Sequence, residues 1–332
     1  MSQRVKLHYT AIILSIILLL HSCNSVDEFS GGKTSGESPI LLSAQPATDY
    51  SRSYIPSGMY DNFKVHSVSE KGGVKTVVMD GYEVKYITDS WTYVTDTQPL
   101  MFWDTNADSY TFTAGAPIDA VSSISATTMT LKLKNNKTGS VMACEPLKIE
   151  KGSPNFGKTV NLLFGYGHCR VCVAFMKNSS TETTITDIKL TPDAQIVSEA
   201  NLTYNYDWSS GTAAVTTTVN TTAKSSESFT YANVTIPVET SDAVLSATRY
   251  YCVPEASNTK DWTVSLTCND EVKSASFVNN YTWESGKNYI YLFSLEENSP
   301  KLVHVISEEM TYFDCNDIIP GGSFSGSDMT EK

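Results

Sequence analysis

The sequence predicts an all-β protein built from two antiparallel β-sandwich domains in tandem. Three observations support this prediction. Short segments in which apolar and polar residues alternate recur along the chain, and this two-residue period is typical of half-buried strands. Thr occupies 38 of the 332 positions and 11% of the residues are aromatic, so residues that favour strands are abundant. About fifteen such segments, separated by short turns, favour two sandwiches over one closed barrel.

The alternation is clearest in two segments, and a third is apolar nearly throughout. Residues 129–134 (MTLKLK) place Met and Leu on one face, and residues 262–268 (WTVSLTC) repeat the pattern. Residues 289–295 (YIYLFSL) predict a central strand covered on both faces. Lys71–Gly73 and Asp80–Gly81 predict turns. Further strands are predicted at 63–68, 74–79, 82–88, 110–114, 169–176, 185–190, 213–220 and 229–236.

The chain is long enough for two domains that each bury a core. Its weakest periodicity lies at Pro192–Glu199, so we place the N-terminal sandwich at residues 39–192 and the C-terminal sandwich at 193–300. Residues 301–332 form a C-terminal tail, which is Gly/Ser-rich and acidic after a predicted strand at Leu302–Ile306.

The amino terminus has the pattern of an export signal. Arg4 and Lys6 precede the apolar run Ala11–Leu20, about half the roughly 20 residues that a membrane span needs. The run ends in Leu-His-Ser-Cys, which resembles a bacterial lipoprotein signal that ends at Cys23. This predicts a signal peptide at 1–22, a lipid on Cys23 and a location at the outer membrane or cell surface. The other interpretation is an ordinary cleaved signal with an incidental cysteine.

A flexible tether is predicted at residues 23–38, which are polar and Gly/Ser-rich. The net charge of −12 comes from 24 basic and 36 acidic residues. Removal of the signal takes away Arg4 and Lys6, so the mature chain carries 22 − 36 = −14. An acidic chain without basic clusters excludes nucleic acid as a partner.

No motif for catalysis or metal binding is present in the sequence. His8 and His21 lie in the signal, and the other three histidines are far apart and outside any metal or triad motif. Asp104 and Asp108 lack the alternating oxygen ligands of a calcium loop. We therefore predict no cofactor, no metal and no enzymatic activity.

The cysteines leave several pairings open. Cys169 and Cys172 have CxxC spacing, but residues three apart on a strand face opposite sides of the sheet, so the two sulfurs cannot coordinate one metal ion. Cys252 and Cys268 flank a predicted hairpin in which Cys252 lies opposite Val264, which disfavours a bond between the two cysteines. Once the first cysteine is lipidated, six remain, and their even number permits three disulfides without choosing among the pairings.

Five segments resemble, in order, the sequences of Bacteroidales fimbrillins, and the resemblance extends over about residues 39 to 296. One departure is the pair Cys169 and Cys172, which replaces the usual small or aliphatic residues. The segments are ILLSAQPATDYSRSYIPSGMY at 40–60 followed by FKV at 63–65, a run from Trp91 through QPLMFWD at 98–104 to YTFTA at 110–114, LFGYGH at 163–168, YCVP at 251–254 and WESGKNYIY at 283–291.

The resemblance implies two transthyretin-like sandwiches and a structural or adhesive subunit of a pilus without catalysis. In such fimbrillins an arginine-directed protease removes the first strand, and the open groove accepts a strand from a neighbouring subunit. The implied partners are other pilin subunits, the outer membrane through the lipid anchor, and a surface receptor or glycan. Arg52 is the cleavage candidate because it follows the strand Ile40–Ala44; an ordinary surface arginine is the other interpretation. The tail is either a donor strand or a disordered end.

The alternative function is a non-polymerising surface lipoprotein that binds glycans. In that case exposed aromatic side chains would stack on sugar rings, whereas in a pilin the same side chains belong to the core. The residues considered for this role are Trp91, Trp103, Trp208 and Trp283.

Overall fold

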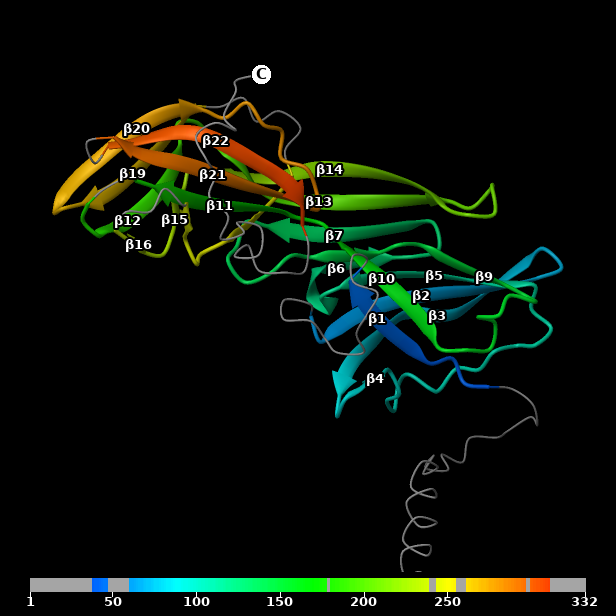
Figure 1. Ribbon diagram of the computed structural model, residues 1–332. Coiled ribbons are helices and arrows are strands. Elements are labelled where there is room, and N and C mark those ends of the chain that lie inside the picture. Colours follow the sequence, from blue (N-terminus) through cyan, green and yellow to red (C-terminus); the bar gives the residue numbers. More distant parts are fainter. Residues whose placement is uncertain are drawn as a thin grey trace, which may run out of the picture. The chain divides into compact units, whose positions relative to one another are not determined.

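The structure is a computed structural model, which describes residues 38–46, 60–177, 180–238, 243–254, 261–296 and 299–310. The described part of the chain contains strands β1 to β22 and one short 3-10 helix, η1 (Ile118–Ala120), and no α-helix (Figure 1). Most strands pair antiparallel in four sheets, which we name sheets I to IV. The all-β prediction is confirmed.

Sheets I and II form one sandwich. Sheet I has the order β1-β10-β8-β5-β2-β3-β4, with β9 paired to β5, and sheet II has the order β14-β13-β7-β6. β5 packs against β6 and β7 of sheet II. The strands of sheet I are β1 (Leu42–Pro46), β2 (Asn62–Lys71), β3 (Val74–Ile87), β4 (Ser90–Thr92), β5 (Ser109–Ala116), β8 (Met142–Cys144), β9 (Leu147–Glu150) and β10 (Val160–Tyr166). Those of sheet II are β6 (Val121–Ile124), β7 (Thr128–Lys134), β13 (Ile196–Asp207) and β14 (Ala214–Ser225).

Sheets III and IV form the second sandwich. Sheet III has the order β17-β11-β21-β22, with β18 also paired to β11, and sheet IV has the order β15-β12-β19-β20, with β16 paired to β12. The strands of sheet III are β11 (Cys169–Met176), β17 (Val244–Leu245), β18 (Tyr250–Cys252), β21 (Lys287–Glu296) and β22 (Ser299–Glu309). Those of sheet IV are β12 (Thr183–Pro192), β15 (Phe229–Thr230), β16 (Val234–Ile236), β19 (Asp261–Cys268) and β20 (Glu271–Val278).

The two sandwiches are interleaved along the sequence. β11 and β12 belong to the second sandwich, yet the next two strands, β13 and β14, return to the first. A division between residues 192 and 193 therefore does not separate the two groups of sheets. β22 likewise crosses the predicted start of the tail at residue 301, because it pairs with β21 along its whole length. Alternation along a strand indicates which face is buried but does not identify the neighbouring strand.

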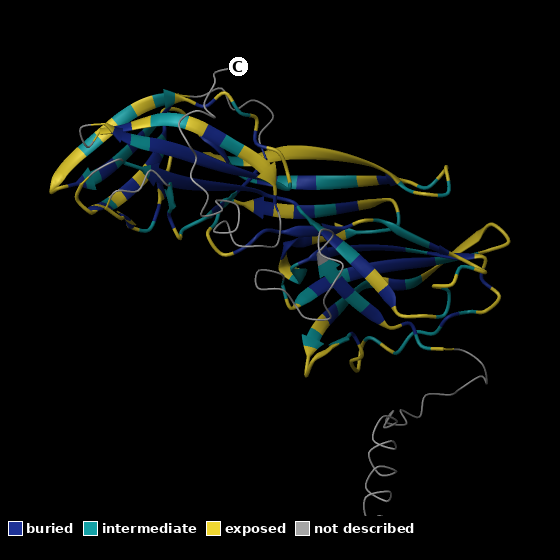
Figure 2. Ribbon diagram, viewed as in Figure 1, coloured by how far each residue is buried: buried dark blue, intermediate teal, exposed yellow. Residues whose placement is uncertain are grey.

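Three apolar clusters account for most of the core. One lies within sheet I, which curls so that β1 contacts β4 at the opposite end of the hydrogen-bonded order. A second lies between sheets I and II, and a third fills the space between sheets III and IV. β11 and β21 are buried on both faces, as predicted for residues 289–295, whereas β14 is exposed along nearly all of its length (Figure 2).

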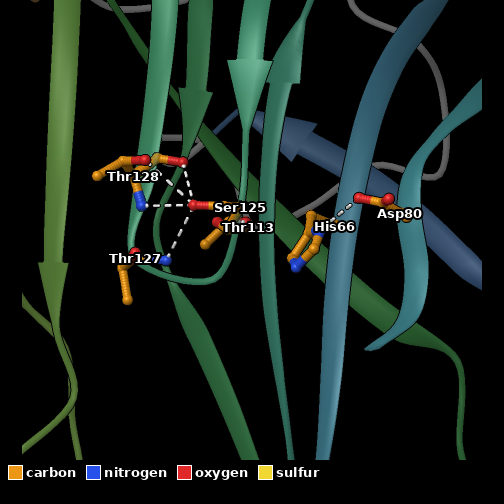
Figure 3. A network of polar contacts seen from close by, with 6 residues as sticks. All are labelled: His66, Asp80, Thr113, Ser125, Thr127 and Thr128. Atoms are coloured by element: carbon orange, nitrogen blue, oxygen red, sulfur yellow. Dashed lines mark hydrogen bonds and ion pairs between the residues drawn. The ribbon is translucent and has the colours of Figure 1, made fainter. Parts of the chain in front are cut away.

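The predicted turn at Asp80–Gly81 is wrong, because both residues lie inside the continuous strand β3. The pairing of β2 with β3 shifts its register on both sides of Ser67, and Gly81 has a φ of +63°. An extra residue in one strand produces such a bulge, and glycine adopts its left-handed conformation without strain. Next to this bulge, His66 Nδ1 lies 3.3 Å from Asp80 Oδ1 (Figure 3).

A small polar network stabilises the hairpin between β6 and β7 (Figure 3). Ser125 Oγ accepts hydrogen bonds from the backbone N–H of Thr127 at 3.3 Å and of Thr128 at 3.0 Å. The Ser125 carbonyl accepts a hydrogen bond from Thr113 Oγ1 at 3.0 Å. Thr113 is the register partner of His66 in the pairing of β5 with β2, so the network ties the hairpin of sheet II to the middle of sheet I.

Candidate functional site

The first strand lies at the edge of sheet I and is held by hydrogen bonds on both sides. β1 pairs with β10 in parallel, with Leu42 opposite Val160 and Pro46 opposite Phe164. The Val160 N–H also donates to the Leu41 carbonyl at 2.8 Å. Parallel pairing is the exception in this sheet, and it places the first described strand beside one that comes about 120 residues later.

On its other side, the segment that precedes β1 pairs with residues 101–103. Pro39 and Phe102 form an antiparallel bridge. The Ile40 N–H donates to the Met101 carbonyl at 2.8 Å, and the Trp103 N–H donates to the Ser38 carbonyl at 2.9 Å. Residues 38–46 therefore fill a gap between β10 and the 101–103 segment, as an added strand would.

Alternate side chains of this strand point into the core. Ile40 is fully buried, and Leu42 and Ala44 are 5% and 8% exposed. Leu41, which lies between two of them, is 49% exposed. The three buried side chains belong to one apolar cluster with Phe63, Val65, Tyr93, Trp103, Phe112, Val160, Leu162 and Phe164. We name the part of this cluster outside residues 38–46 the groove.

Aromatic rings form much of the groove. The ring of Phe63 lies 5.4 Å from that of Phe164 and 5.0 Å from that of Trp91, measured between centroids. Trp103 lies 4.7 Å from Tyr110 in an edge arrangement. Aromatic side chains bury a large area each, so these rings supply much of the apolar surface that the first strand covers.

Tyr93 connects the first strand to the opposite rim of the groove. Its hydroxyl donates to the Ile40 carbonyl at 2.8 Å and accepts a hydrogen bond from the Met101 N–H at 3.1 Å. Burial raises the pKa of Tyr93 to about 12, while its hydrogen bond to Met101 acts in the opposite direction. Sequence reasoning did not single out this residue, since one tyrosine among many carries no motif.

The two modification sites predicted from the sequence, Cys23 and Arg52, lie outside the described residues. Arg52 falls in the segment 47–59, between the end of β1 and Tyr60, where the described residues resume. Among the residues that the structure describes, no cluster of His, Cys, Asp and Glu could hold a metal ion. In the same part of the chain no helix is long and apolar enough to cross a membrane.

A family model described as fimbrillin-like matches residues 57–309 of the chain. The chain belongs to the fimbrillin-like family. This confirms the resemblance seen in the sequence, and it supports a pilus or adhesin subunit as the class of protein. The match begins after β1. None of the curated protein sequences compared with this fimbrillin-like chain matches it.

Two solved structures share the fold of this fimbrillin-like protein. One is a proposed cell adhesion protein from Bacteroides uniformis, with a TM-score of 0.52 and 12% identity over 84% of this chain and 100% of its own. The other is a proposed cell adhesion protein from Bacteroides ovatus, with a TM-score of 0.50 and 11% identity over 83% of this chain and 98% of its own. At this level of identity the comparison establishes the fold alone.

The tryptophans considered for sugar stacking are not arranged as an exposed platform in this fimbrillin-like chain. Trp103 and Trp283 are only 1% and 3% exposed. Trp91 is half-buried against Phe63, and Trp208 is half-buried with its indole N–H donating to the Ala126 carbonyl at 2.7 Å. Their burial favours a role in the core over contact with a sugar ring.

Of the two predictions about the cysteines, the one for Cys169 and Cys172 is confirmed and the one for Cys252 is wrong. Cys169 and Cys172 lie in different apolar clusters on opposite faces of β11, as predicted from their spacing. The predicted register of Cys252 opposite Val264 is wrong, because β18 pairs with β11 and places Cys252 opposite Cys169. Cys268 lies opposite Ile185 of β12 and Glu271 of β20 instead.

Proposed function

We propose that this chain is a surface lipoprotein subunit of a pilus, structural or adhesive, which assembles by strand exchange after its first strand is removed. The observation that carries the proposal is the seating of residues 38–46 in the groove. This segment comes first in the described chain, lies at a sheet edge and buries alternate side chains. A neighbouring subunit's strand with apolar residues at every second position would meet the same groove and the same free backbone groups.

Cleavage after Arg52 would separate the first strand from the rest of the chain. All the contacts of β1 with the sandwich would then be non-covalent, so another strand could replace it. The described C-terminal strand, β22, is occupied in sheet III, and the candidate donor strand therefore lies in residues 311–332, which follow it. Lipidation of Cys23 would hold the precursor at the outer membrane until the cleavage releases it.

The test is controlled cleavage of the purified chain with an arginine-specific protease. After the predicted signal the only arginines are Arg52, Arg170 and Arg249, and Arg170 is 4% exposed. We expect a new amino terminus at Ser53 and a ladder of oligomers that resists SDS. Arg52→Ala should remain monomeric under the same treatment, and the matched control Arg249→Ala should assemble like the native chain.

Two results would contradict the proposal. One is assembly of Arg52→Ala into the same ladder, and the other is an assembled protein whose amino terminus is not Ser53. A protein that stays monomeric and binds glycans measurably would instead favour the alternative function, a non-polymerising surface lipoprotein that binds glycans. The anchor is tested separately by metabolic labelling with a palmitate analogue, which should label the native chain and leave Cys23→Ala unlabelled.

A further inference from the structure

Cys169 and Cys252 are direct partners in the antiparallel pairing of β11 with β18. They are 83 residues apart in the sequence, and both are completely buried in the cluster between sheets III and IV. Directly opposite residues project to the same face of a sheet, so the two side chains lie next to each other. The Cys169 thiol points at its partner, with Sγ 3.4 Å from the Cys252 carbonyl oxygen.

The Cα spacing that the strand pairing implies at this position is compatible with a disulfide. Tyr251 uses its N–H and carbonyl for hydrogen bonds to Asn136 on the side away from β11, at 2.8 and 2.9 Å. The N–H and carbonyl of Cys252, the next residue, therefore face β11. Such a hydrogen-bonded pair has its Cα atoms about 5.5 Å apart, which lies within the range of about 4.4–6.8 Å seen across disulfides. Its Cβ atoms start at up to about 5.5 Å, so the two strands must move locally to bring them to the roughly 3.5–4.5 Å of a disulfide.

We propose that Cys169 and Cys252 form a cross-strand disulfide in the exported protein. The inference rests on the export that is part of the proposed function, since structural disulfides persist in oxidising compartments outside the cytoplasm. The other described cysteines have no cysteine as their register partner, and Cys172 lies on the opposite face of β11 from this pair.

The bond would form by exchange with the disulfide of a thiol oxidoreductase. The thiolate of one cysteine attacks the oxidant's disulfide and releases one of its sulfurs as a thiolate. The second cysteine then attacks the mixed disulfide and releases the other sulfur. The chain loses two protons and two electrons, and the oxidant gains them as two thiols. Burial raises the pKa of the Cys252 thiol, so the exchange belongs to folding, before β18 closes over β11.

The disulfide would strengthen the junction between the two sandwiches. β18 has only three residues, and its pairing with β11 is short. The same segment reaches the first sandwich through the paired backbone bonds of Tyr251 with Asn136 and through the Val253 N–H, which donates to Asn135 Oδ1 at 2.8 Å. Without the disulfide, β18 is held on β11 and on the first sandwich by hydrogen bonds and packing. A covalent bond at Cys252 would keep β18 paired with β11 when tension acts along a pilus.

The sequence allows the bond to be mapped with trypsin. Cleavage after Arg170 separates the two cysteines of the CxxC segment, so Cys169 falls in peptide 159–170 and Cys172 in peptide 171–177. Cys252 falls in peptide 250–260. The full chain is reduced, refolded in a glutathione redox buffer, alkylated and digested. We expect peptides 159–170 and 250–260 to appear linked, at a mass two hydrogens below their sum, with Cys144 and Cys268 alkylated.

Alkylation of both peptides, or a link from either one to peptide 171–177, would overturn the proposal. The same map is then made on protein from the cell surface. Alkylated Cys169 and Cys252 on a chain whose signal has been removed overturn the proposal while leaving the proposed function intact. A chain that still carries Met1 has not had its signal removed. That result would contradict export, and with it the proposed function on which the disulfide proposal rests.

A stability measurement provides a second readout that does not depend on peptide detection. Reduction of the native oxidised chain should lower its Tm by roughly 5–10 °C, because a bridge between distant residues restricts the unfolded chain. Cys252→Ala should show no such shift on reduction, whereas the control Cys268→Ala should keep it. An equal response to reduction in both variants would overturn the proposal.

Discussion

The Nδ1 atom of His168 accepts a hydrogen bond from the backbone N–H of Val141 at 3.0 Å. His168 is fully buried where the chain passes from β10 to β11, and so from one sandwich into the other. Its own N–H donates to Ser140 Oγ at 3.2 Å, and its carbonyl accepts a hydrogen bond from the Gly286 N–H at 2.9 Å. One histidine therefore joins the residues before β8 to the residues before β21.

The stability of the fold should fall in mild acid because of this histidine. Burial lowers the pKa of His168 to about 4 from its usual 6.5. A folded-state pKa below the unfolded one means that the contribution is fully present above pH 6.5 and is lost as the pH falls toward 4. We expect the free energy of unfolding to drop by about 3 kcal/mol over this window, measured by urea denaturation at several pH values.

A pair of variants separates His168 from the other groups that titrate. His168→Asn keeps a hydrogen-bond acceptor for the Val141 N–H but cannot gain a proton, so it should lose the part of the pH dependence that His168 contributes and keep the part that comes from His66, whose pKa burial also lowers. His304→Asn, at an exposed position of β22, should retain the native dependence. An unchanged slope in His168→Asn would rule out the explanation.

Sheets I and II should not tolerate a side chain at Gly115. A Cβ atom there would lie 2.8 Å from Leu131 Cδ2 and from Met129 Sδ, and 2.9 Å from Val121 Cγ2. Gly115→Ala should therefore destabilise the fold by about 1–3 kcal/mol, since three packed side chains must move. The matched control is Gly165→Ala on β10, where the nearest atom would be the Ala143 carbonyl oxygen at 3.9 Å. Equal midpoints in urea for the two variants would contradict the packing argument.

Local features of the fold could be predicted from the sequence because they depend on neighbouring residues. The alternation at residues 262–268 became β19, in which Trp262, Val264, Leu266 and Cys268 are buried. The prediction of a turn at Asp80–Gly81 is wrong because glycine occurs in bulges as well as in turns. Which of the two forms depends on the pairing with the neighbouring strand.

Pairings between distant strands could not be predicted, and they make up most of the candidate site. The strand at Ile40–Ala44 was expected, but its parallel pairing with β10 depends on a segment about 120 residues away. The register of Cys252 with Cys169 follows from the same kind of long-range pairing. A period of two residues determines which face of a strand is apolar. It does not select the partner, because any other strand with one apolar face could pair beside it.

Removal of one hydroxyl should loosen the first strand. Tyr93→Phe leaves the Ile40 carbonyl without its donor and the Met101 N–H without that acceptor, while the ring still fills the groove. We expect a loss of about 1–3 kcal/mol in the free energy of unfolding. Tyr82→Phe is the control, because the Tyr82 hydroxyl makes a weak contact of 3.6 Å with Met101 Sδ. A larger loss for Tyr82→Phe than for Tyr93→Phe would contradict this assignment.

Two adjacent leucines test whether the first strand is bound through one face. Leu42 is 5% exposed in the groove, whereas Leu41 is 49% exposed on the other side of the same strand. Leu42→Ala should cost about 2–5 kcal/mol, since a buried leucine leaves a cavity. Leu41→Ala should stay within about 0.5 kcal/mol of the native chain, as is usual at the surface. The measurement is urea unfolding of both variants in the uncleaved chain. Similar losses in the free energy of unfolding at the two positions would show that the groove does not bind alternate side chains of the strand. An exchanged strand would then have no side-chain pattern to set its register in the groove.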